Sequence, residues 1–126
     1  MRILIVLLIL GHFLDAPAWA QSGFSGSPDA GAILFEQCRG CHSDTEDVHM
    51  AGPSLFNLIG REMGSAEGFE FSTALAQDDH VWDTGLLTAW LVQPQILVSE
   101  TEMHFEGLHT RQDIENLIAY ITTLKN

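Results

Sequence analysis

Positive charge is scarce in this chain. Its 126 residues include 5 Lys and Arg against 17 Asp and Glu, which gives a formal net charge of -12. Binding to the phosphate backbone of a nucleic acid requires clustered cations, so the composition excludes DNA and RNA as partners. The same shortage argues against docking on an anionic lipid surface.

The chain is also short and lacks strand patterns. Its 126 residues supply about one domain, which argues against a two-domain enzyme with a deep interdomain cleft. No stretch alternates apolar and polar residues for long enough to predict a strand. Hydrophobic residues make up 46% of the chain, a fraction typical of a packed domain rather than a disordered acidic tail.

The first twenty residues have the pattern of a secretory signal peptide. Arg2 precedes an apolar run from Ile3 to Leu10, and Ala18-Trp19-Ala20 offers a small-residue cleavage site. A retained membrane anchor is the alternative, but the apolar stretch is shorter than the roughly 20 residues that span a bilayer. We expect cleavage after Ala20 and export, most simply into a bacterial periplasm, with no stable membrane insertion afterwards.

Cleavage leaves a short lead-in and one domain. Residues 21–27 are rich in Gly and Ser and predict a flexible segment, and residues 28–126 form the predicted domain. Helix signals place a first helix from Pro28 to about Arg39, with Ser27 as its cap, and helical turns over residues 54–59 and 72–77, each with a serine at its start. A further helix is expected from Thr84 to Val92, with Asp83 as its cap and Pro94 marking its end.

The last helix has the clearest pattern. Thr110 is expected to cap it. Four apolar residues then recur at the spacing of a single buried face, namely Ile114, Leu117, Ile118 and Ile121. These signals predict a small all-α protein with four to five short helices and long loops. Such a chain buries little core, so we expect a cofactor, a metal or a disulfide to complete it.

Both cysteines lie in one motif, Cys38-Arg39-Gly40-Cys41-His42. This C-x-x-C-H pattern is typical of covalent attachment of a c-type haem. Two thiols three residues apart at a helix end share a face, so both can form thioethers along one haem edge. The adjacent His42 is then placed as an axial ligand of the iron. The motif therefore predicts one covalent haem c.

Three other interpretations of the cysteines compete with haem attachment. The thiols of an exported protein could form a disulfide. A thioredoxin-like redox pair would require a βαβ pattern, which the sequence does not have. A structural zinc site needs four spaced ligands, and no second cysteine pair exists.

An electron-transferring haem needs a second permanent axial ligand, and the thioether of Met is the usual partner of His. Met103 is favoured because it lies in an irregular segment, far enough from His42 to reach the opposite haem face. Met50 follows His42 too closely, and Met63 is the alternative. His104 adjoins Met103 but points the other way on an extended backbone.

These residues together resemble the class I monohaem cytochromes c. The resemblance covers Gly31 to the C-terminal helix. It rests on segments that follow in the family's order: Gly31-x-x-x-Phe35 before the attachment motif, Gly52-Pro53-x-Leu55, Gly60-Arg61, Trp82, Pro94, Thr101-Glu102-Met103-His104-Phe105, and Leu117-Ile118-Ala119-Tyr120.

The resemblance implies a small cytochrome c fold wrapped around one covalent haem. It implies a soluble one-electron carrier in a periplasmic or respiratory chain, and not an enzyme. His42 and Met103 would ligate the iron, and the carbonyl of Pro53 would accept the hydrogen bond of His42. Arg61 and Trp82 would face the haem propionates.

Several positions depart from the family pattern. Phe71 replaces a tyrosine that bonds a propionate, and Trp90 replaces a tyrosine near the Met sulfur. Ser99 and Glu100 replace a Pro-Gly pair. The loop that carries Met103, the ligand loop, is therefore expected to be more mobile and its Met less firmly held. A labile Met would favour a protein that binds or senses peroxide, CO or NO. A dedicated subunit of a periplasmic dehydrogenase is a further alternative.

The charge of the ligand loop also departs from the family. Familiar basic members carry a ring of lysines around the haem edge, whereas this chain has Lys125 as its single lysine. Glu100, Glu102 and Glu106 surround Met103. We expect a monomer whose donors and acceptors are redox proteins with a basic docking patch. Acidity that merely keeps an exported protein soluble is the alternative.

Overall fold

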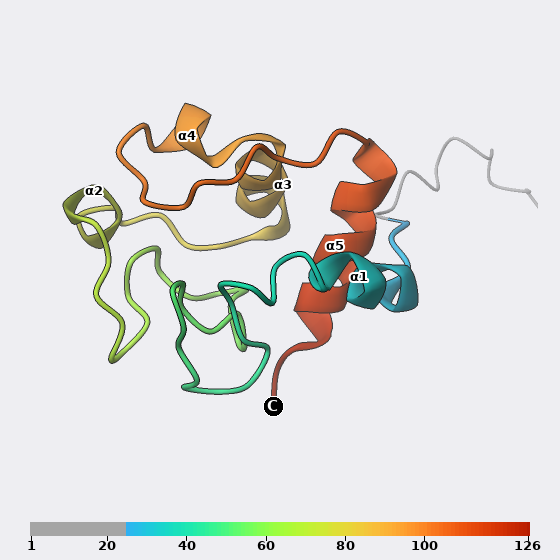
Figure 1. Cartoon of the computed structure of the whole chain (residues 1–126), viewed down its shortest axis with the longest axis horizontal. Coiled ribbons are helices and arrows are strands. Elements are labelled where there is room, and N and C mark those ends of the chain that lie inside the picture. Colours follow the sequence, from blue (N-terminus) through green and yellow to red (C-terminus); the bar gives the residue numbers. More distant parts are fainter. Residues whose placement is uncertain (1–24) are drawn as a thin grey trace, which may run out of the picture.

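The computed structural model describes residues 25–126 (Figure 1). The predicted signal peptide and residues 21–24 of the predicted lead-in lie outside the described residues. This described part of the chain contains five helices: α1 (Pro28–Phe35), α2 (Thr73–Ala76), α3 (Thr84–Val92), α4 (Pro94–Leu97) and α5 (Arg111–Thr123). Extended pairing within residues 25–126 is limited to one isolated antiparallel bridge, between Glu62 and Val81. The predicted all-α class is confirmed.

Side-chain caps start the longer helices at the predicted residues. Ser27 accepts from a backbone N–H of α1 at 3.3 Å, Asp83 from one of α3 at 2.7 Å, and Thr110 from one of α5 at 3.1 Å. Each cap satisfies a backbone donor that has no partner inside the helix. These local signals therefore fix where the three helices begin.

The end of the first helix differs from the prediction. α1 stops at Phe35, and the chain continues to His42 in hydrogen-bonded turns, with the N–H of Cys38 on the carbonyl of Phe35 at 2.8 Å. The N–H of His42 in turn bonds the carbonyl of Cys38 at 2.9 Å. Gly40 is a poor helix former, which favours this loosening.

Residues 54–59 form an irregular loop with turns at residues 56–57 and 59–60, and not the predicted helical turn. Asn57 has a φ of 53°, a left-handed conformation that ends any right-handed helix. The hydroxyl of Ser54 donates to the carbonyl of Thr45 at 2.6 Å and accepts from the N–H of Phe56 at 3.2 Å. Ser54 therefore organises a loop where the sequence suggested a helix cap.

Pro94 has a second role that the sequence analysis missed. It ends α3 as predicted, and it also occupies the first turn of the short helix α4. Proline suits this position because its fixed φ is helical and its missing N–H would have no partner there.

The helices α1 and α5 cross closely and form one side of the molecule (Figure 1). A Cβ at Gly31 would lie 2.7 Å from Cβ of Tyr120 and would clash with the carbonyl of Asn116, so only glycine permits this approach. The rings of Phe35 and Tyr120 pack with centroids 5.1 Å apart. The four residues predicted for the apolar face of α5 are all buried.

The N-terminal end of the described chain is attached to α5. The N–H of Ser27 donates to Oδ1 of Asn116 at 2.8 Å, and the hydroxyl of Ser25 donates to Glu115 at 3.0 Å. No helix within residues 25–126 is both long and apolar enough to cross a membrane.

Candidate cofactor site

A cavity of about 350 Å³ lies between the loops and the helices α3 and α5. The segment that follows α1 and the segment around Met103 approach from different sides of the molecule (Figure 1). All seven predicted site residues line this cavity: Cys38, Cys41, His42, Pro53, Arg61, Trp82 and Met103. Apolar residues from α3 and α5 complete its wall: Leu87, Trp90, Leu91, Leu117 and Ile121.

His42 is oriented by a single hydrogen bond. Its Nδ1 lies 2.7 Å from the carbonyl oxygen of Pro53. A carbonyl oxygen can only accept, so Nδ1 carries the proton and Nε2 of the neutral ring offers a lone pair. Burial lowers the pKa of His42 below its usual value, the positive charge of Arg61 acts in the same direction, and the bond to Pro53 opposes them. The ring is therefore neutral at pH 7 and able to bind a metal.

Gly52 makes room for the ring of His42. A Cβ at this position would clash with Cε1 of His42 and would lie 2.7 Å from its Nδ1. The backbone of Gly52 also ties the two loops together, because its N–H donates to the carbonyl of Cys41 at 2.7 Å. Glycine at residue 52 is therefore required by the position of the imidazole.

Cys38 and Cys41 are free thiols. Burial, followed by the neighbouring Cys41, raises the pKa of Cys38 to about 11. Cys41 is exposed at the edge of the cavity. The two sulfurs are therefore available on the same wall as the imidazole of His42.

Met103 is held at all three of its polar atoms. Its N–H donates to the hydroxyl of Thr101 at 3.2 Å, and its carbonyl accepts from Nε2 of Gln95 at 2.8 Å. Its sulfur accepts from Nε1 of Trp90 at 3.3 Å. These bonds anchor a loop for which the sequence predicted a weakly held Met.

The other two methionines of residues 25–126 do not line the cavity. Met63 is packed in the core with 3% of its surface exposed, and its N–H bonds the carbonyl of His80 at 2.8 Å. Met50 is 48% exposed on the surface. The geometry therefore favours Met103 over the alternative, Met63.

Arg61 is a partly buried cation on the cavity wall. Its guanidinium donates to the carbonyls of Ser54 at 2.9 Å and Phe56 at 3.2 Å, and burial lowers its pKa below the usual value. Within residues 25–126, no carboxylate forms an ion pair with it. A buried cation without an anion fits a cofactor that carries carboxylates.

Aromatic side chains close the remaining wall. Trp82 is 8% exposed and packs edge-on against Trp90, with ring centroids 5.3 Å apart. Phe71 lines the cavity and packs edge-on against Phe69 at 4.8 Å. The hydroxyl that the family pattern would supply at residue 71 is replaced by an aromatic contact.

Gln95, Thr101 and His49 are contributors that the sequence analysis missed. His49 joins two loops: its Nδ1 accepts from the N–H of Ser54 at 3.0 Å, so its Nε2 donates to the carbonyl of Glu67 at 2.8 Å. No local pattern marks these residues. Their roles depend on contacts between segments that the sequence does not place together.

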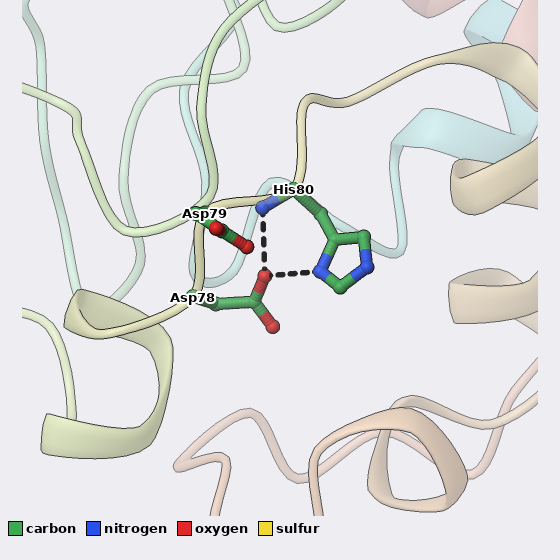
Figure 2. Close-up of side chains that lie close together, drawn as sticks. All are labelled: Asp78, Asp79 and His80. Carbon is green, nitrogen blue, oxygen red and sulfur yellow. Dashed lines mark hydrogen bonds and ion pairs between the residues drawn. The ribbon is translucent and has the colours of Figure 1, made fainter.

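A second group of titratable side chains lies on the turn between α2 and α3 (Figure 2). One carboxylate oxygen of Asp78 accepts from Nδ1 of His80 at 2.6 Å and from its backbone N–H at 2.9 Å. The bond to Asp78 raises the pKa of His80, and Asp79 adds to this effect. These bonds are internal to the turn, so the group shapes the backbone that leads into the bridge at Val81.

The fold and this cavity define a class. Helices α2, α3 and α5 and the loops between the helices line a largely apolar cavity, and its wall also carries a C-x-x-C-H motif, a neutral imidazole and a thioether. This is the arrangement of a monohaem c-type cytochrome.

Comparisons with the sequences and structures of known proteins support this class, whereas no family model matches the chain. It is 35% identical over 102 residues to cytochrome c of Euglena viridis, covering 80% of this chain and 100% of that one. It is 35% identical over 102 residues to cytochrome c2 of Rhodoblastus acidophilus, covering 80% of this chain and 95% of that one. The structure of cytochrome cH from Methylobacterium extorquens matches with a TM-score of 0.73 and 33% identity, covering 78% of this chain and 99% of that one.

The chain belongs to the monohaem cytochrome c and c2 family. It is therefore an electron-transfer protein and not an enzyme. Membership implies a covalent haem c, and the two cysteines it requires are present. The neutral imidazole of His42, the space left by Gly52 and the cation of Arg61, which forms no ion pair within residues 25–126, all fit that group.

Proposed function

We propose that this protein is a soluble one-electron carrier of a periplasmic or respiratory chain. Its haem c would be bound through Cys38 and Cys41, with His42 and Met103 as iron ligands. When bound, the haem supplies an iron centre that alternates between Fe(III) and Fe(II). The observation that carries the proposal is that His42, Met103 and both cysteines line the same cavity, with Nδ1 of His42 bonded to Pro53 and the sulfur of Met103 bonded to Trp90.

The protein's own residues would keep the two axial ligands in place. The carbonyl of Pro53 fixes the orientation and basicity of the imidazole of His42. Trp90, Gln95 and Thr101 fix Met103. If His42 and Met103 both bound the iron, small molecules would be kept from it, which would favour a carrier over a sensor of CO, NO or peroxide.

The residues around the cavity would bury the cofactor and neutralise part of its charge. Apolar side chains of α3 and α5 exclude water, which limits the reorganisation that accompanies electron transfer. Arg61 and Trp82 would face the propionates. Arg61 suits this role because it is a partly buried cation without a protein carboxylate partner among residues 25–126.

Export is part of the proposal. The predicted signal peptide would direct the chain to the periplasm, the compartment in which haem c is attached. N-terminal sequencing of the protein recovered from the producing cell tests this step. A chain that begins at Gln21 is expected, and a chain that still begins at Met1 would refute cleavage.

Ligation is tested with the purified holoprotein. Acid-acetone extraction should leave the haem on the polypeptide. Met103→Ala should keep the covalent haem but lose the near-infrared band of a sulfur-iron bond, whereas the matched variant Met50→Ala should retain it. A band that survives in Met103→Ala would point to Met63. A reduced wild-type spectrum that changes on addition of CO would favour the ligand-binding alternative.

A further inference from the structure

The surface beside Met103 has an unusual composition for a docking region. We name it the α4 face and define it by six exposed residues: Val92, Ile96, Leu97, Glu100, Glu102 and Glu106. Glu102 also lines the cavity, so the face borders the cavity mouth.

Contacts between segments join these residues into one surface. Nε2 of Gln95, next to Ile96, donates to the carbonyl of Met103. The N–H of Leu108 donates to the carbonyl of Leu91 at 2.8 Å. A Cβ at Gly107 would clash with the carbonyl of Val92, so the end of the loop lies directly on the end of α3. The loop, α3 and α4 therefore adjoin one another, and all six exposed residues of the α4 face belong to these adjoining segments.

Cations are absent from this face. Residues 25–126 contain four Lys and Arg, and none lies between residues 92 and 109. Arg39 is paired with Glu36 and Asp44, and Arg111 is paired with Glu115. The six residues that define the α4 face therefore carry three carboxylates and no cation.

Apolar side chains are unusually exposed on the same face. Ile96 is 72% exposed, Val92 49% and Leu97 42%. Exposed apolar residues bordered by charges of one sign are typical of a protein interaction site. The apolar groups provide short-range contact, while the carboxylates set the orientation and raise the association rate.

We infer that the α4 face docks a redox protein whose own electron-transfer site is ringed by lysines or arginines around an apolar centre. This inference rests on the proposed carrier function. The acidic and cation-free surface selects such a partner by charge complementarity. A second copy of this chain is disfavoured as occupant, because it would bring the same net charge of -12.

The test uses isotopically labelled holoprotein and, as the probe, a basic mitochondrial-type cytochrome c. Nuclear magnetic resonance spectra are recorded as the probe is added. Amide shifts are expected at residues 92–106 in low salt and should vanish as salt rises from about 0.01 M to about 1 M, where the Debye length falls from about 30 Å to about 3 Å. Shifts that map to another face, or none in low salt, would overturn the inference.

Paired variants separate local charge from total charge. Glu102→Gln with Glu106→Gln should weaken binding about three- to tenfold, as expected for the loss of two exposed ion pairs. Asp29→Asn with Glu46→Gln removes the same charge from exposed residues elsewhere and should leave binding unchanged. Equal weakening by both pairs would show that only total charge matters and would refute the α4 face.

The apolar contribution has its own matched pair. Ile96→Ser should weaken binding, whereas Ile33→Ser, which alters a residue of α1 that is 75% exposed, should not. The visible spectrum of each variant checks that it is folded around its haem. A redox titration of the holoprotein without the probe tests the carrier function separately, so a protein that titrates reversibly yet shows no docking would refute this inference alone.

Discussion

The indole N–H of Trp90 donates a hydrogen bond to the thioether sulfur of Met103 over 3.3 Å. The indole is itself held in place, because Trp82 packs edge-on against it. A sulfur that accepts a hydrogen bond has less electron density to offer to iron. Trp90 therefore occupies a position from which it can adjust the strength of the proposed axial bond.

Replacing Trp90 with Phe should lower the reduction potential. The variant keeps an aromatic ring but loses the N–H, so the sulfur becomes a better donor and stabilises Fe(III). A hydrogen bond of about 0.5–1.5 kcal/mol that acts on one oxidation state corresponds to about 20–60 mV for a one-electron couple. Spectroelectrochemical titration measures the shift, and an unchanged or higher potential would contradict this role.

Gln95 should hold the ligand loop through the carbonyl of Met103. Gln95→Ala removes the 2.8 Å hydrogen bond and should weaken the sulfur-iron bond by about 1 kcal/mol, so the near-infrared band should disappear at a lower temperature. Gln93→Ala is the matched control, because the side chain of Gln93 is exposed and forms no cap. Identical melting of the band in the two variants would show that Gln95 is dispensable.

Gly52→Ala should disturb the imidazole of His42. The added Cβ would clash with the ring, and overpacking of this kind costs about 1–3 kcal/mol of unfolding free energy. Gly40→Ala adds the same group where no atom lies within 4 Å and should leave stability nearly unchanged. Denaturant titration of the two holoproteins compares them. Equal stability would mean that the loop yields easily around His42.

His80 should titrate above its usual pKa of about 6.5. Asp78 stabilises its protonated form, so this contact contributes stability that is fully present below the unfolded pKa and is lost as pH rises through the folded pKa. Asp78→Asn should bring the pKa back toward its usual value. Nuclear magnetic resonance titration of the His80 ring measures both proteins, and equal pKa values would refute the pairing.

Local chemistry could be predicted from the sequence because neighbouring residues determine it. The caps at Ser27, Asp83 and Thr110 need only the next helical turn, and each forms as predicted. The C-x-x-C-H motif likewise brings its three side chains together within one turn. The resemblance to the family then predicted that Met103 belongs to the same site, and Met103 lines the cavity.

Features that depend on distant segments could not be predicted in this way. Asn57 adopts a left-handed backbone where a helical turn was predicted, and no pattern in the sequence predicted this conformation. The bond from Gln95 to Met103 forms only because α4 folds back against the ligand loop. The role of His49 requires a loop that lies 18 residues further along the chain to meet it.

The bonds from Ser25 and Ser27 to α5 determine where the polypeptide enters the domain. They reach Glu115 and Asn116, whereas Leu117 and Ile121 of the same helix line the cavity. Residues 25–27 are therefore joined to the domain through α5, and not through the segments that form the α4 face.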